Sequence, residues 1–120
     1  MIHSYKDLIV WQKAITLVTE VYKLTELFPK EEMYGLSSQV RRSAISIPSN
    51  IAEGRSRGTR KDFSQFVRIA YGSGAELETQ LLIAKTLPRT QSLDYRKVDN
   101  LLEEIMKMLN SMLRKLNPRN

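Results

Sequence analysis

The sequence has no cysteine, one histidine and no long apolar run among its 120 residues, and each of these absences removes a class of function. Disulfides and thiolate metal sites are excluded. The single histidine, His3, gives little support for a catalytic triad, and the Glu-x-x-His pairs of di-iron helical bundles are missing. No apolar stretch reaches the ~18 residues of a membrane span. We therefore expect a cytoplasmic, soluble protein that is not an enzyme and holds no metal or cofactor.

Apolar residues recur at helical spacing in four segments, and no segment shows the alternation of a strand. The expected helices run over residues 7–28, about 32–57, about 60–87 and from about 93 onward. Pro29 and Pro88 end the first and third segments, and Ser92 is the expected N-cap of the fourth. Long helices with short connections predict one all-α domain over residues 1–120, an up-down-up-down antiparallel four-helix bundle.

A proline in the middle of the second segment predicts a kink in that helix. The apolar stripe continues through Ser46–Gly54, yet Pro48 removes one backbone hydrogen bond and clashes with the preceding turn, at a cost of roughly 3 kcal/mol. Either packing accommodates the kink, or the kink shapes a surface. Small residues around Gly72 and Gly74 predict that another helix approaches the third helix closely, and the kinked helix is the expected partner.

A set of linked motifs spreads over nearly the whole chain. The motifs are the runs Asp7–Ala14, Phe28–Pro29 with Glu32–Leu36, Gln39–Ile45, Ser46–Gly54, Ile69–Ser73 and Glu76–Glu78. Together they resemble the four-helix-bundle proteins encoded within intervening sequences of bacterial 23S rRNA genes. A protein similar to these is the accessory variability determinant of diversity-generating retroelements.

The resemblance implies a bacterial four-helix bundle that assembles as a homopentamer and binds nucleic acid. The retroelement relative forms a pentameric ring and binds nucleic acid alongside a reverse transcriptase. RNA or DNA, contacted through phosphates, is therefore the expected partner. The alternative is a protein-interaction or scaffolding module that engages an acidic partner such as a polymerase or reverse transcriptase. The family supplies no base-reading motif, so the binding residues must be argued from charge.

The net charge of +6 favours an anionic partner, and cations gather at one end of the expected bundle, where the second loop meets the C-terminus. The expected nucleic-acid-binding residues are Arg55, Arg57, Arg60 and Lys61 around the loop, with Arg114, Lys115 and Arg119 as outer support. Charges that complement helix dipoles are the competing explanation. That explanation fails for Arg60 and Lys61, because they begin a helix, where positive charge is unfavourable. Phosphate contact and a merely solvated basic end both stay open.

The first and fourth helices have apolar faces wider than one seam of a monomeric bundle requires. Trp11, Tyr22, Met106 and Leu113 are expected to stay partly exposed and to be buried in a contact between subunits. A wider core within one subunit is the competing explanation.

Overall fold

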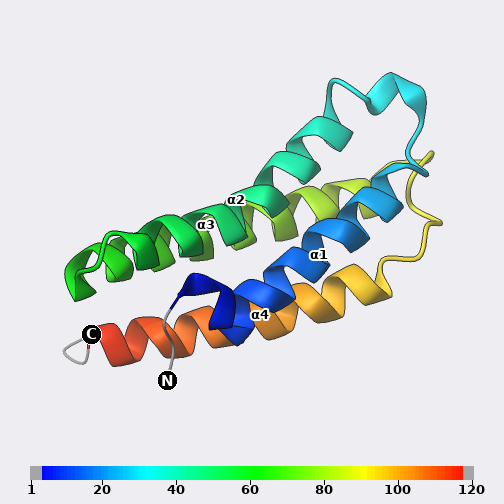
Figure 1. Cartoon of the computed structure of the whole chain (residues 1–120). Coiled ribbons are helices and arrows are strands. Elements are labelled where there is room, and N and C mark those ends of the chain that lie inside the picture. The colour runs from blue at the N-terminus through cyan, green and yellow to red at the C-terminus, as the bar shows by residue number, and fades with distance from the viewer. Residues whose placement is uncertain (1–3, 118–120) are drawn as a thin grey trace.

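The computed structural model describes residues 4–117, which form four antiparallel α-helices packed as a bundle (Figure 1). The elements are α1 Ile9–Thr25, α2 Leu36–Ser56, α3 Arg60–Thr86 and α4 Arg96–Leu116, with short 3₁₀ helices η1 at Tyr5–Asp7 and η2 at Lys30–Glu32. Each long helix contacts two others, in the order α1, α2, α3, α4 and back to α1. The predicted all-α bundle is confirmed. Within the described residues, no helix is both long and apolar enough to span a bilayer.

One hydrophobic core takes residues from all four helices. Its members from α1 are Val10, Ala14, Leu17, Val21 and Leu24, each at most 5% exposed. Their spacing alternates between four and three residues, so they lie on one side of the helix. Burial of each large side chain contributes roughly 1.5–3 kcal/mol, and this packing, more than helix propensity, holds the helices in place.

A glycine and a capping threonine form the connection between α2 and α3. Gly58 has a φ of +84°, the left-handed conformation that glycine favours, and it follows Arg57, the C-cap residue of α2. Thr59 then caps α3, because its side chain accepts a hydrogen bond of 3.1 Å from the backbone N–H of Asp62. This tight turn places the first residues of α3 beside the last residues of α2.

The start of α4 differs from the prediction. The helix begins at Arg96, later than expected, and the predicted N-cap at Ser92 is wrong. The physical reason is that Tyr95 turns inward: its side chain is 5% exposed, and its hydroxyl donates to the carbonyl of Thr90 at 2.8 Å. Burial raises the pKa of Tyr95. Thr90 is itself fully buried and donates to the carbonyl of Ala84 at 2.6 Å, near the end of α3. The connection is therefore packed, and tertiary contacts override the local cap signal.

We expect Thr90→Val to lower the free energy of unfolding by about 1–3 kcal/mol, because valine keeps the shape of threonine but leaves the buried carbonyl of Ala84 without its donor. Urea denaturation followed by circular dichroism measures the difference. Thr86→Val is the matched control, since Thr86 makes a similar bond to the carbonyl of Ile83 at an exposed position. An equal loss in both variants would contradict the explanation by buried hydrogen bonding.

α2, which contains Pro48, changes direction partway along its length, as the ribbon shows, while it remains one continuous helix (Figure 1). The predicted kink is confirmed. Pro48 is buried, and it also lines a groove together with Trp11 and Ile15 of α1. Packing thus accommodates the proline, and the same residue contributes to a surface.

The small residues of α3 meet two different helices rather than the kinked helix alone. Ser73 shares a hydrogen bond of 2.8 Å with Ser46 of α2, as expected. Gly74 instead faces α4, because a Cβ atom at this position would overlap Sδ of Met106. Gly72 faces open space, with no atom within 4 Å of the place that a Cβ would take. The prediction that both glycines pack against the kinked helix is therefore wrong. The orientation of α3 about its own axis points Gly74 toward α4 and Gly72 away from all other helices.

The close approach between α2 and α3 lies at Gly54. A Cβ atom there would stand 2.5 Å from Cβ of Phe66. Farther along the same contact, the amide of Asn50 donates to Oγ of Ser46 at 2.9 Å, which extends the bond between Ser46 and Ser73 into a small polar network. Glycine thus sets the distance between the two helices, and the polar network sets their register.

Candidate nucleic-acid interface

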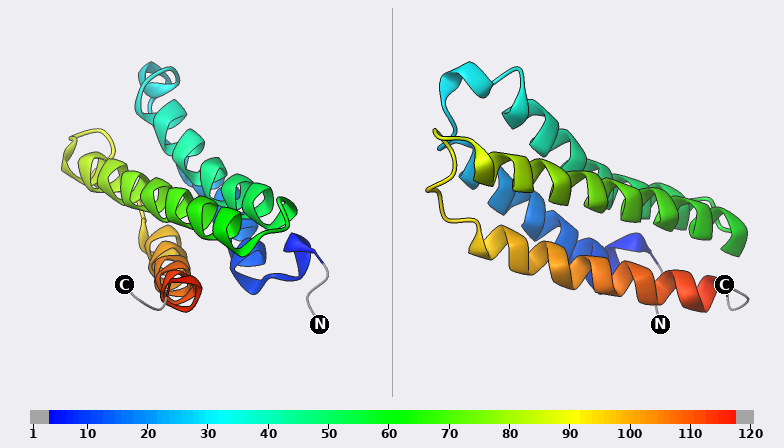
Figure 2. Two further views of the ribbon diagram at one scale, coloured as in Figure 1. Left: turned by 90° about the vertical axis from the view of Figure 1, so that its left-hand side faces the viewer. Right: turned by 180° about the vertical axis from the view of Figure 1, so that it is seen from behind.

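The connection between α2 and α3 lies beside the end of α4, so two basic segments meet at one end of the bundle (Figures 1 and 2). Two hydrogen bonds join them. The guanidinium of Arg60 donates to the carbonyl of Lys115 at 2.5 Å. The amide of Asn117 donates to Oγ of Ser64, also at 2.5 Å. The up-down-up-down topology predicts this meeting, and the contacts fix it in place.

Arg60 shows why a cation can begin α3. Positive charge at the start of a helix is unfavourable, but this guanidinium reaches the last turn of α4, where carbonyl groups lack partners within their own helix. Arg60 therefore stabilises the negative end of a neighbouring helix. The expectation that helix dipoles cannot account for Arg60 is wrong, and one of its N–H groups is engaged within the protein.

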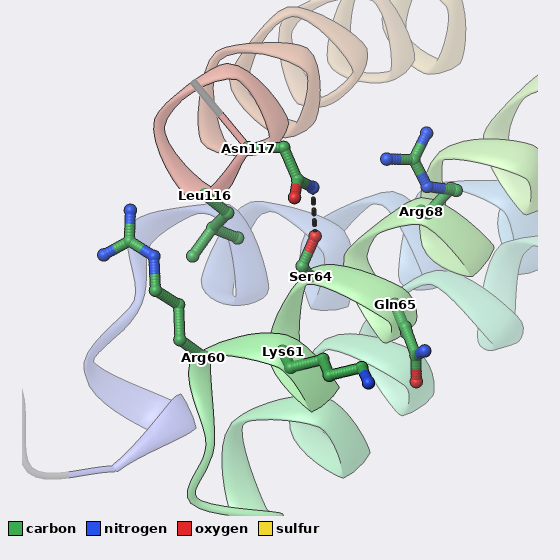
Figure 3. A pocket seen from close by; sticks show the side chains of 7 residues that line it. All are labelled: Arg60, Lys61, Ser64, Gln65, Arg68, Leu116 and Asn117. Carbon is green, nitrogen blue, oxygen red and sulfur yellow. Dashed lines mark hydrogen bonds between the residues drawn. The ribbon is translucent and has the colours of Figure 1, made fainter. Parts of the chain in front are cut away.

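A groove of about 510 Å³ opens between the first turns of α3 and the end of α4 (Figure 3). Arg60, Lys61 and Arg68 are its charged lining residues, and no carboxylate lines it. The remaining lining residues are Ser64, Gln65, Leu116 and Asn117. Arg60 reaches toward the end of α4, whereas Lys61 points away from it (Figure 3). Lys61 and Arg68 are exposed, and no carboxylate among residues 4–117 pairs with either. Exposed cations among neutral polar groups suit a phosphate.

The two arginines at the end of α2 are less available than the sequence suggests. Arg57 forms an ion pair of 2.9 Å with Glu53, and its guanidinium lies 5.1 Å from the centre of the Phe66 ring. Arg55 is partly buried and has an interaction of its own within the protein. Neither arginine lines the groove. The geometry therefore makes Lys61 a stronger candidate for phosphate contact than Arg55 or Arg57.

The outer cations stand in the last turn of α4. Arg114 and Lys115 are exposed there, next to the groove but outside its lining. Arg119 falls outside the described residues. The backbone of Lys115 is tied to α3 through Arg60, so the last turn of α4 holds a fixed place beside the groove.

Arg68 and the neutral groups of the groove were not among the binding residues predicted from charge. A signal for Arg68 exists, because Lys61, Gln65 and Arg68 stand at positions i, i+4 and i+7 and thus share one face of a helix. Between residues 54 and 75, Asp62 is the single acid. The contribution of Asn117 had no such signal, because it depends on where α4 ends relative to α3.

Acids pair with cations at the opposite end of the bundle. Arg89 pairs with Glu31, and this hydrogen bond holds the pKa of Glu31 below its usual value. Hydrogen bonds from Arg96 lower the pKa of Asp94 to about 2. The charge asymmetry between the two ends therefore comes from paired acids at one end and an acid-free groove at the other.

The chain belongs to the 23S rRNA-intervening sequence protein family, whose model matches residues 6–111. This range includes the α3 side of the groove and stops before Leu116 and Asn117. A similar solved structure is that of a protein with unknown function from the S23 ribosomal protein family of Bacteroides thetaiotaomicron VPI-5482. The chains are 27% identical, the match covers 88% of this chain and 99% of that one, and the TM-score is 0.77. A comparison with curated proteins found no match.

Proposed function

We propose that this protein binds RNA or DNA through the phosphate backbone, without catalysis, as a ring-shaped homo-oligomer. A pentamer is what the family resemblance implies. The observation that carries the proposal is the groove at the start of α3, where Lys61 and Arg68 are exposed and no carboxylate lines the wall. Such cations make charge-assisted hydrogen bonds to phosphate, which give affinity with little sequence preference.

The spacing of these two cations favours a polymer over a single small anion. Lys61 and Arg68 are seven residues apart, so their backbones are separated by about 10.5 Å along the helix axis. Two phosphates of one strand can engage the pair, and Gln65 adds a neutral donor between them. A strand that follows α3 therefore uses more of the groove than an isolated phosphate does.

Assembly in a ring would multiply these contacts, because each copy brings the same groove. Part of the wide apolar face serves the core, since Trp11, Met106 and Leu113 pack against it as partly buried side chains. Tyr22 remains 36% exposed and Ile15 remains 42% exposed on α1. These exposed apolar side chains support a contact between subunits.

We expect the wild-type protein to bind single-stranded RNA of unrelated sequences with similar affinity near physiological salt. Log affinity should fall linearly with log salt from about 50 to 200 mM, with a slope of roughly −0.7 for each phosphate contact. Fluorescence anisotropy of labelled RNA measures both quantities. Absence of binding to either RNA or DNA at about 150 mM salt would remove the proposed function.

The alternative function is engagement of an acidic protein, such as a polymerase or reverse transcriptase, through the same basic end. A pull-down with and without nuclease separates the two. A protein partner that stays bound after nuclease treatment, together with no direct RNA binding, would establish the alternative.

A further inference from the structure

An apolar groove of about 280 Å³ runs along the outer side of α1 and α2. Trp11 and Ile15 of α1 and Ile45 and Pro48 of α2 are among its lining residues. Ile15 is 42% exposed and Ile45 is 40% exposed, so the described chain leaves these side chains partly uncovered. Beyond Ile45 the surface continues to Arg42, which has no ion-pair partner among residues 4–117. The lining of the groove is thus uncharged, and a basic residue lies just beyond one of its ends.

The outer face of α3 is a second uncovered surface. Ile69, Gly72, Glu76 and Ile83 share this face at spacings of three, four and seven residues. Ile69 is 50% exposed and Ile83 is 46% exposed. Gly72 stands in the helix interior, where glycine weakens a helix, and no atom lies within 4 Å of the place that its Cβ would take. Packing within the described chain gives no reason for this glycine, whereas close approach by another molecule does.

The two surfaces complement each other in shape and in charge. The α1–α2 groove is concave, and the α3 face is a convex helix surface that is lowest at Gly72. Arg42 lies exposed beside the groove, and Glu76 lies exposed on the α3 face, with no ion-pair partner among the described residues. Opposite charges at the edge of an apolar contact steer association and fix its register.

We propose that the outer face of α3 in one copy docks into the α1–α2 groove of a second copy, which brings Glu76 of the first copy next to Arg42 of the second. The two surfaces are different, so the contact is head-to-tail, and contacts of this kind close into a ring when the rotation between copies permits. The inference rests on the proposed assembly and specifies the surfaces that make it. The bend at Pro48 then contributes to the wall that receives α3.

Gly72→Arg tests the α3 face, and Ile45→Arg tests the groove. Arginine is a good helix former and both positions are exposed, so each variant should keep the helical circular dichroism of the wild type. In sedimentation at micromolar concentration, we expect an oligomer for the wild type and a 13.9 kDa monomer for each variant. Asn110→Arg adds the same charge on an exposed position of α4 and should stay assembled.

A mixture of the two variants tests the head-to-tail pairing. The Gly72→Arg chain keeps an intact groove, and the Ile45→Arg chain keeps an intact α3 face, so an equimolar mixture should form dimers and nothing larger. A monomeric wild type, a variant that stays assembled, or a mixture that stays monomeric would each overturn the proposal. RNA binding is measured separately on the same samples. An assembled wild type that binds no nucleic acid removes the proposed function and leaves this interface standing.

Discussion

Replacing Lys61 and Arg68 together by alanine is expected to weaken RNA binding about a hundredfold. Each substitution removes a charge-assisted phosphate contact of about 1.5 kcal/mol, and 1.4 kcal/mol corresponds to a factor of ten in affinity. The salt slope should flatten by roughly 0.7 for each lost contact with a single strand. The loss should be the same for RNAs of unrelated sequence, because phosphates carry no sequence information. Both side chains are exposed, so the fold should survive, and fluorescence anisotropy measures affinity and slope.

The matched control is Lys30→Ala with Lys97→Ala, which removes the same charge from exposed positions at the opposite end of the bundle. Its affinity should stay within about threefold of the wild type, since long-range attraction between exposed charges is screened beyond about 8 Å. An equal loss in the two double variants would show that net charge alone governs binding and would contradict the groove. Arg57→Ala should also cost less, because Arg57 is already paired with Glu53.

Gly54→Val is expected to lower the free energy of unfolding by about 3 kcal/mol and the melting temperature by roughly 10 °C. A Cβ atom at this position would stand 2.5 Å from Cβ of Phe66 and 3.3 Å from the ring of Phe63. Cβ of Phe66 is fixed to the backbone of α3, so no rotation of a side chain relieves the overlap. The helices α2 and α3 would have to separate along their shared contact. Urea denaturation and calorimetry measure the two quantities.

Gln39→Val controls for helix propensity, because it introduces the same β-branched residue at an exposed position of α2. It should cost only a few tenths of a kcal/mol. Gly74→Ala is a second comparison. The nearest neighbour of Gly74 is the flexible end of Met106, which can move, so the loss should be smaller than at Gly54. A Gly54 variant as stable as the Gln39 control would contradict the close approach of the two helices.

The existence and order of the four helices were predictable because they depend on local pattern, although α1 is shorter than expected and α2 begins only at Leu36. The four-three spacing of apolar residues in α1 and the turn signals at Gly58 and Thr59 act over a few residues. The start of α4 was not predictable, since burial of Tyr95 and Thr90 overrides the local signal. The packing partner of Gly74 depends on how α3 is rotated against α4, which local pattern does not specify.

The bundle topology predicted at which end the cations gather. The sequence could not rank the individual cations by their availability for phosphate contact. Arg57 and Lys61 look equivalent along the chain, yet a carboxylate one turn away pairs with the first and none of the described carboxylates pairs with the second. The hydrogen bond from Arg60 to α4 requires that the start of α3 and the end of α4 lie at the same position along the bundle axis. Helix lengths known only to within a few residues cannot establish that.

An acid-free groove at one end and paired acids at the other give the bundle an electric dipole along its long axis. In the field of a polyanion, such a molecule turns before it makes contact and arrives with its basic end first. The molecule measures 45 × 26 × 22 Å. Lys61 and Arg68 span only about 10.5 Å of the long dimension, so a strand that engages them lies over the first turns of α3 at the basic end. The rest of the bundle then projects away from the nucleic acid, with its side surfaces free for other copies.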